Sequence, residues 1–172
     1  MTWTEPATML TDYALAILCL WIAISLGRRG GNRRMGHWVA AFLVTGFAAL
    51  AGGTAHGFRI PLGESHPPLW RITVVAIAAG AALLIAAGLR SALRPEVDDR
   101  EARRAGHRWL KRAVAVSLVG LAVLVLKSAP HRHFNHNDLY HLIQMGGLYC
   151  LYRGAELLHG LSGSDRRRGT GN

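Results

Sequence analysis

Five blocks of nearly continuous apolar sequence dominate this chain and limit what it can fold into. Each block approaches or reaches the roughly 20 residues that a helix needs to cross about 30 Å of hydrocarbon. The blocks lie at residues 7–26, 37–58, 69–89, 109–126 and 139–158. Only helices and closed barrels span bilayers, and these blocks are too long and continuous for barrel strands. The sequence therefore predicts an all-α, polytopic membrane bundle of five transmembrane helices.

The overall composition agrees with a membrane protein. The chain has 172 residues, of which 51% are hydrophobic and 17% are charged, whereas about 25% of the residues of a soluble domain are charged. The formal net charge of +10 is also typical of nucleic-acid-binding proteins. Here, however, the basic residues flank the apolar blocks, and no nucleic-acid-binding motif accompanies them. We expect a lipid bilayer as the partner and no nucleic acid.

The basic residues also predict an orientation. Sixteen of the 20 Lys and Arg residues fall on one side of the five blocks, and the positive-inside rule places that side in the cytoplasm. The N-terminus is then outside and the C-terminus inside. No positive charge precedes the first block, so we expect it to remain as an anchor. Residues 1–160 form the predicted transmembrane domain, 161–172 a disordered basic tail, and a bacterial inner (cytoplasmic) membrane the expected location.

Polar residues gather at the opposite, extracytoplasmic side. Asp12 is about 9 Å along its helix from Pro6, at 1.5 Å per residue, and shares a face with Glu5 and Thr8. Its simplest role is to pair with a base such as Arg71; the alternative is a metal or proton-handling site. Six of the nine histidines share this side, and ionisable groups at such depths usually mark a functional site. They are His56, His66, His131, His133, His136 and His141.

The strongest local signal is the start of the fifth block. Asp138 and His141 are one turn apart on the same helix face. Asp138 is well placed to cap the helix, but capping does not explain His141, which lies inside the block. A histidine beside a carboxylate is a common way to bind a divalent metal such as zinc. His131 and His133 are interpreted as loop residues.

In its layout the chain resembles the ceramidase and progestin-receptor-like (CREST) superfamily of membrane hydrolases. The resemblance rests on Glu5 or Asp12 in an early span, on His56 after Gly52-Gly53-Thr54, and on Asp138 with His141 in the last span. The superfamily implies zinc-dependent hydrolysis of lipid amides or esters. This chain differs in having five blocks where members usually have seven, and it lacks their HxxxH motif in the last span.

The first functional hypothesis is therefore a zinc-dependent membrane hydrolase acting on a lipid substrate near the outer leaflet. His56, His141 and either His136 or Asp138 would hold the metal and leave one position for water. Asp12 would act as general base or orient the water. Asp12 and Asp138 are the candidate catalytic carboxylates.

Three alternatives stay open. Two histidines on different spans, or Met145, could ligate haem b in a redox subunit. A small bundle rich in Ala and Gly also suits an accessory subunit of a larger membrane complex. Transport is a further alternative, although the polar residues do not continue through the membrane. The cytoplasmic side, with His37, His107 and His159, is expected to hold no comparable cluster beyond an Arg153–Glu156 pair.

Overall fold

The structure is a computed structural model that describes residues 3–129, 131 and 134–161. The elements are α1 (Pro6–Gly57), α2 (Arg59–Leu62), the 3-10 turn η1 (Gly63–Ser65), α3 (His66–Leu93), α4 (Arg100–Val125) and α5 (His136–Leu158). The described residues contain no β-strand. The all-α prediction is confirmed. Arg132, His133 and the predicted tail from residue 162 onward lie outside the described residues.

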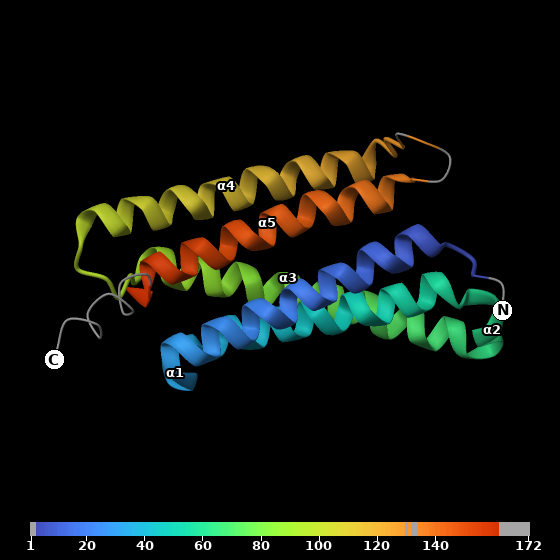
Figure 1. The fold of residues 1–172 in the computed structure, drawn as a ribbon, viewed down its shortest axis with the longest axis horizontal. Coiled ribbons are helices and arrows are strands. Elements are labelled where there is room, and N and C mark those ends of the chain that lie inside the picture. Colours follow the sequence, from blue (N-terminus) through green and yellow to red (C-terminus); the bar gives the residue numbers. More distant parts are fainter. Residues whose placement is uncertain (1–2, 130, 132–133, 162–172) are drawn as a thin grey trace, which may run out of the picture.

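Helix α1 is a hairpin of two antiparallel arms, a first arm (Pro6–Arg29) and a second arm (Met35–Gly57). Figure 1 shows the chain reversing between them. The Thr4 amide donates to the Gly57 carbonyl at 3.1 Å, which joins the two open ends. Glycine permits this approach, because a Cβ on Gly57 would lie 2.2 Å from the Met9 sulfur. Small residues thus pack the arms together, as expected for membrane helices.

The helices are arranged side by side along one long axis (Figure 1). The second arm of α1 and α3 lie on one side, and α5 packs on the first arm. Helix α4 packs along α5, and its contacts with α3 are few. We name the end of the bundle with Trp3 and His56 the amino end, and the end with Glu96 and Leu161 the carboxyl end.

Three segments are long and apolar enough to cross a membrane: Pro6–Arg29, Met35–Gly57 and Arg59–Leu93. Helices α4 and α5, with 26 and 23 residues, are long enough but fall short in apolar character. The chain thus has the length and composition of a membrane protein, and the topology with five spans stays a prediction. Large apolar side chains such as Ile17, Val75 and Val125 point outward, as lipid-facing residues do.

Helix α4 starts earlier than the predicted fourth span. The Asp99 side chain accepts a hydrogen bond from the Glu101 amide at 2.8 Å and caps the helix at Arg100. The helix therefore includes the basic segment that precedes the apolar block at residue 109. Loop 94–99 connects α3 to it, and the Glu96 amide donates to the Leu158 carbonyl at 2.9 Å. This bond holds the loop against the end of α5.

Candidate functional site

The start of α5 is joined to the start of α1 by a buried polar link. Asn135 caps α5, and Asp138 completes a capping box by accepting from the Asn135 amide at 2.7 Å. The other Asp138 oxygen accepts from the Thr8 hydroxyl at 2.7 Å. Both residues are fully buried, and both carboxylate oxygens are engaged. The capping role considered for Asp138 is therefore the one that the structure shows, and we assign no catalytic step to this residue.

Next to this link, the structure brings Asp12 and His141 together from different helices. Asp12 Oδ1 lies 3.3 Å from His141 Nε2, with side-chain exposures of 7% and 13%. The other ring nitrogen, Nδ1, lies 3.0 Å from the Thr11 hydroxyl. Thr11 in turn contacts the Thr8 carbonyl at 3.0 Å. Two titratable side chains are thus held beside each other in a nearly water-free setting, where electrostatic interactions are strong.

His56 is the second histidine of this end. Its Nδ1 lies 3.1 Å from a carboxylate oxygen of Glu5, and its ring meets the Trp70 indole edge-on with centroids 5.4 Å apart. Glycine again permits the packing, because a Cβ on Gly53 would lie 2.8 Å from the Tyr13 ring. The first arm can therefore lie close to the second at this depth. We name Glu5, Asp12, His56 and His141 the amino-end cluster.

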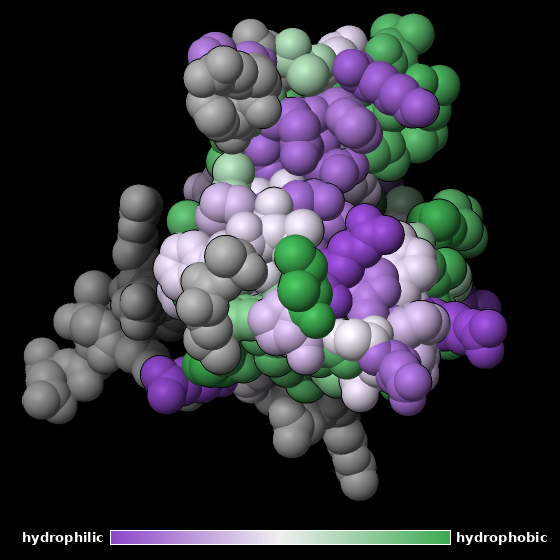
Figure 2. All heavy atoms as spheres, turned by 90° about the vertical axis from the view of Figure 1, so that its right-hand side faces the viewer, coloured by the Kyte–Doolittle hydropathy of each residue, from purple (hydrophilic) through white to green (hydrophobic). Residues whose placement is uncertain are grey.

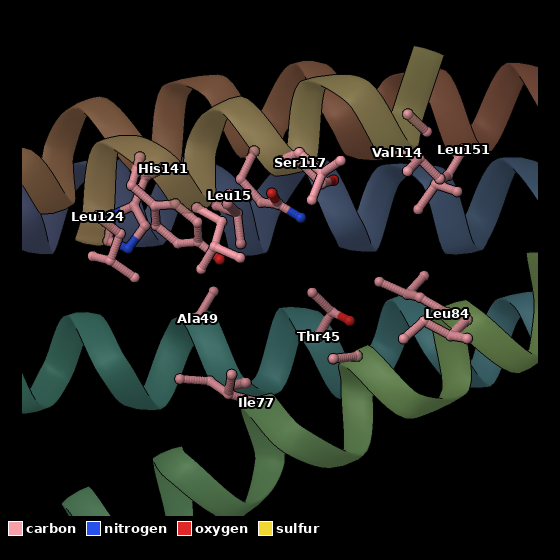
Figure 3. A pocket seen from close by; sticks show the side chains of 18 of the residues that line it. Leu15, Thr45, Ala49, Ile77, Leu84, Val114, Ser117, Leu124, His141 and Leu151 are labelled. Atoms are coloured by element: carbon pink, nitrogen blue, oxygen red, sulfur yellow. The ribbon is translucent and has the colours of Figure 1, made fainter. Parts of the chain in front are cut away.

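The cluster stands at one end of a long groove with a volume of about 1020 Å³. Asp12, His56 and His141 line it together with Tyr140 and Gln144. Its walls are mostly apolar side chains from α3, α4 and the second arm of α1. Figure 3 shows Thr45, Ala49, Ile77 and Leu84 on one side, and Val114, Ser117, Leu124 and His141 on the other. The groove therefore combines a polar end with an apolar body.

The polar character of this end is also visible from outside. Figure 2 faces the amino end of the bundle and shows hydrophilic residues gathered over its middle, with hydrophobic residues mainly along the right-hand side of the view. The predicted histidine layer corresponds to this end: His66 begins α3, and the backbone of His131 is hydrogen-bonded to that of Phe134. His136 begins α5 and is not among the described residues that line the groove.

The residues present do not fit a zinc ion. A catalytic zinc site needs three protein ligands with free lone pairs converging on one point. Among the described residues, no group of three His, Cys, Asp or Glu side chains meets that geometry. Both ring nitrogens of His141 face protein partners, and His136 is apart from the groove. The alternative haem ligand Met145 packs against the hydrophobic core. We therefore assign no step to a metal or a haem.

A second polar cluster, which the sequence did not predict, occupies the carboxyl end. The Trp38 indole donates to the Ser91 hydroxyl at 3.0 Å, and Ser91 Oγ lies 3.0 Å from His159 Nε2. His159 Nδ1 is 3.3 Å from Glu96. We name these four residues the carboxyl-end cluster. The expectation that this side lacks a comparable cluster is wrong, because a single serine and an indole carry no sequence signal that they join a polar cluster.

The predicted pair of Arg153 and Glu156 is confirmed at 2.5 Å. It is part of a larger group, because the buried Glu156 carboxylate also accepts from Arg29 and from the Tyr152 hydroxyl. Arg29 comes from the first arm of α1, so the group ties that arm to α5. Glu156 is fully buried, and its carboxylate joins the two arginines and the tyrosine of this group.

The sequence also gave no role to several residues of the amino end and the groove. Thr8 and Thr11 hold Asp138 and His141, but a hydroxyl in a membrane helix is a weak signal. The apolar blocks of α3 and α4 contained no candidate site residue in the sequence, yet they form the walls of the groove. Thr73 and Ser117, isolated polar residues within those blocks, could have indicated a lined cavity.

The fold and the site define an all-helical protein of membrane composition with an apolar groove that ends in a carboxylate–imidazole cluster. The chain belongs to the family described as "Family of unknown function (DUF6962)", whose model matches residues 7–100 and 99–159. No curated protein and no solved structure matches the chain. The resemblance to the ceramidase-like superfamily therefore stays a prediction.

Proposed function

We propose that this protein is a membrane-embedded hydrolase that binds a lipid-like amphiphile in the groove and cleaves an ester or amide bond at its polar end. The observation that carries the proposal is the buried Asp12–His141 pair, 3.3 Å apart, at the polar end of an apolar groove. Pockets that bind small molecules are mostly apolar, with a few polar groups that fix orientation. This groove has that arrangement.

The apolar body of the groove supports a substrate with a long hydrocarbon chain. Residues such as Leu84, Leu118 and Leu121 line it, and they present aliphatic surface to whatever lies inside. An aliphatic ligand in the groove makes dispersion contacts with these side chains, which they would lack if the groove were empty. The polar group of the same ligand then contacts the amino-end cluster. The groove therefore fixes how deep the ligand lies and which way it points.

The reaction uses water and the pair of titratable side chains. A water proton passes to the Asp12–His141 pair, which acts as general base. The resulting hydroxide bonds to the carbonyl carbon, and the C–O or C–N bond breaks. The proton then passes to the leaving oxygen or nitrogen, which regenerates the pair. Asn137, Tyr140 and Gln144 line the same end and supply N–H and O–H donors for the developing oxyanion.

The proposal includes a topology with five spans, in which α4 and α5 complete the bundle. The excess of Lys and Arg at the carboxyl end supports a cytoplasmic location for that end. The amino-end cluster would then face the outer leaflet of a bacterial inner membrane, and the substrate would be a lipid of that leaflet. Cysteine accessibility at Ser65, in η1, tests this orientation, because the thiol of Ser65→Cys is expected to react with an impermeant reagent from outside.

The test of the activity uses the full chain in nanodiscs, supplied with a panel of acyl esters and amides of lipid alcohols and amines, with products followed by mass spectrometry. Wild type is expected to release fatty acid from at least one class, and Asp12→Asn to lose at least about 100-fold of that rate, the low end for a general base. Glu64→Gln is the matched control, because Glu64 is exposed in η1 and does not line the groove. No release by wild type, or equal rates for the two variants, would contradict the proposal.

A binding protein without turnover is the second candidate, favoured by the observation that both ring nitrogens of His141 already have protein partners. The same nanodisc experiment separates the two functions. A binding protein retains a long-chain lipid through purification and releases no product from any member of the panel. A hydrolase consumes the bound lipid, so that fatty acid appears in proportion to time.

A further inference from the structure

The groove is longer than a lipid of one leaflet can fill. Along α3 its lining begins at Trp70 and ends at Ala92, and this separation corresponds to about 33 Å at 1.5 Å per residue. The hydrocarbon core of a bilayer is about 30 Å thick, so the groove extends through all of it. The chains of one leaflet reach only about half of that thickness. A lipid headgroup at the amino-end cluster therefore leaves the other half of the groove to a different molecule.

The far half of the groove ends in positive charge. Its last lining residues on α4 are His107 and Lys111, and the Lys111 side chain is exposed. His107 Nδ1 lies 2.8 Å from the Arg103 carbonyl and Nε2 lies 3.1 Å from the Ala92 carbonyl. Among the described lining residues Asp12 alone is acidic, and it is at the opposite end.

We infer that the carboxyl end of the groove is a separate binding site for an anionic phospholipid of the adjacent leaflet. The phosphate would face Lys111, and the acyl chains would lie along Leu89, Leu110 and Val114. A basic residue near a membrane surface attracts anionic lipid, and here it is coupled to an apolar slot that holds the chains. The inference is independent of the reaction proposed above, because none of these residues belongs to the amino-end cluster.

Gly88 offers a way to close this half of the groove without disturbing the fold. It lines the groove, and a Cβ built on it meets no heavy atom within 4 Å. A larger side chain there would project into the space assigned to the acyl chains. Because glycine is also the least favourable residue after proline inside a helix, Gly88→Leu is expected to fold.

The experiment titrates the detergent-purified full chain with phosphatidylglycerol or phosphatidylcholine and counts bound lipids by native mass spectrometry. Wild type is expected to bind phosphatidylglycerol in preference to phosphatidylcholine. Lys111→Gln should weaken phosphatidylglycerol binding about fivefold, and Gly88→Leu should abolish this binding. Arg112→Gln is the matched control: it removes one positive charge at the same depth, but its guanidinium lies 4.9 Å from the Trp109 ring centroid and it does not line the groove.

Three outcomes would overturn the inference. Equal weakening by Lys111→Gln and Arg112→Gln would show a general effect of surface charge. Equal binding of the two lipids by wild type would show that the headgroup is not recognised. Unchanged phosphatidylglycerol binding by Gly88→Leu would place the lipid elsewhere. A protein without hydrolase activity but with the expected lipid binding would sustain this inference and refute only the proposed reaction.

Discussion

The two ends of the bundle hold the same pair of groups in different surroundings. At the amino end, Asp12 lies 3.3 Å from a ring nitrogen of His141. At the carboxyl end, Glu96 lies 3.3 Å from a ring nitrogen of His159. The first pair lines a groove of about 1020 Å³, whereas His159 is enclosed with the fully buried Ser91 and Trp38 and lines no part of it.

The difference shows that access, rather than residue type, separates a candidate site from a structural contact. A carboxylate and an imidazole lie side by side at both ends. At the carboxyl end, however, the imidazole is buried and does not line the groove, and the hydrogen-bonded chain from Trp38 to His159 instead fixes α1, α3 and the end of α5 relative to one another. Such buried polar networks specify packing when their groups are satisfied.

The largest expected effect is on activity, and it distinguishes His141 from His159. His141→Gln should lower kcat/KM for the lipid substrate by about 100-fold to 10,000-fold, the range for a general acid–base group. His159→Gln should leave kcat/KM near that of wild type, because His159 does not line the groove. Steady-state rates in nanodiscs of the same composition measure both. An equal loss in the two variants would mean that the two pairs do not differ in function.

The next effect concerns stability and is centred on Glu156. Glu156→Gln should lower the free energy of unfolding by about 3 kcal/mol, the low end for breaking a buried ion pair. The low end applies because Arg29 is half exposed and regains water when its partner is lost. Reversible unfolding in mixed micelles measures the change, with the exposed Glu64→Gln as the control. A change as small as that of the control would show that the carboxylate is not needed to join the first arm to α5.

A smaller effect distinguishes the cap from the candidate base at the amino end. Asp138→Asn should reduce the free energy of unfolding by about 1–2 kcal/mol, because an amide nitrogen replaces an oxygen that accepts from a backbone or hydroxyl donor. Turnover of the folded protein should be retained, in contrast to Asp12→Asn. Hydrogen exchange at the first turn of α5 measures the loss of stability. The turnover rate under conditions where the variant is fully folded measures the activity. A folded Asp138→Asn protein with a 100-fold lower turnover rate would show that Asp138 is a catalytic residue.

The smallest expected effect is on stability, and it concerns the packing around two glycines, Gly88 and Gly53. Gly88→Ala should stabilise the protein by about 0.5–1 kcal/mol, because alanine favours a helix interior and its Cβ meets open space. Gly53→Ala should do the opposite, because its Cβ would lie 2.8 Å from Tyr13 and 2.9 Å from Asp12. Thermal unfolding of both variants in one detergent gives the sign. A stabilised Gly53→Ala protein would show that the arms are more loosely packed than the structure indicates.

The helices could be predicted because apolar length alone requires them. The block at 37–58 corresponds to the second arm (Met35–Gly57), and the block at 139–158 corresponds to α5 (His136–Leu158). The start of α4 could not be placed in the same way, since residues 100–108 are charged and carry no apolar pattern. There the helix is set by the Asp99 cap, a local signal that is easily overlooked among neighbouring acids.

The site was predictable only in part, for a related reason. Asp12 and His141 stand out because ionisable residues are rare in apolar blocks, and the structure does bring them together. The partners Thr8 and Asp138 are 130 residues apart, and joining them requires the rotation of each helix about its axis. A block that is apolar on every face carries little information on that rotation, so the Ser91–His159 contact could not be predicted from the sequence, and isolated polar residues such as Thr73 and Ser117 were the sole sign of the groove.

The few contacts between α3 and α4 determine how a ligand reaches the groove. These two helices supply opposite walls, so in the proposed topology with five spans the slot between them would open sideways toward the acyl chains of the bilayer rather than toward water. A hydrophobic ligand then arrives by diffusion in two dimensions from a reservoir in which it is already dissolved. Its occupancy depends on its mole fraction among the surrounding lipids, and the apparent affinity falls as unrelated lipid is added, even when the aqueous concentration is held constant.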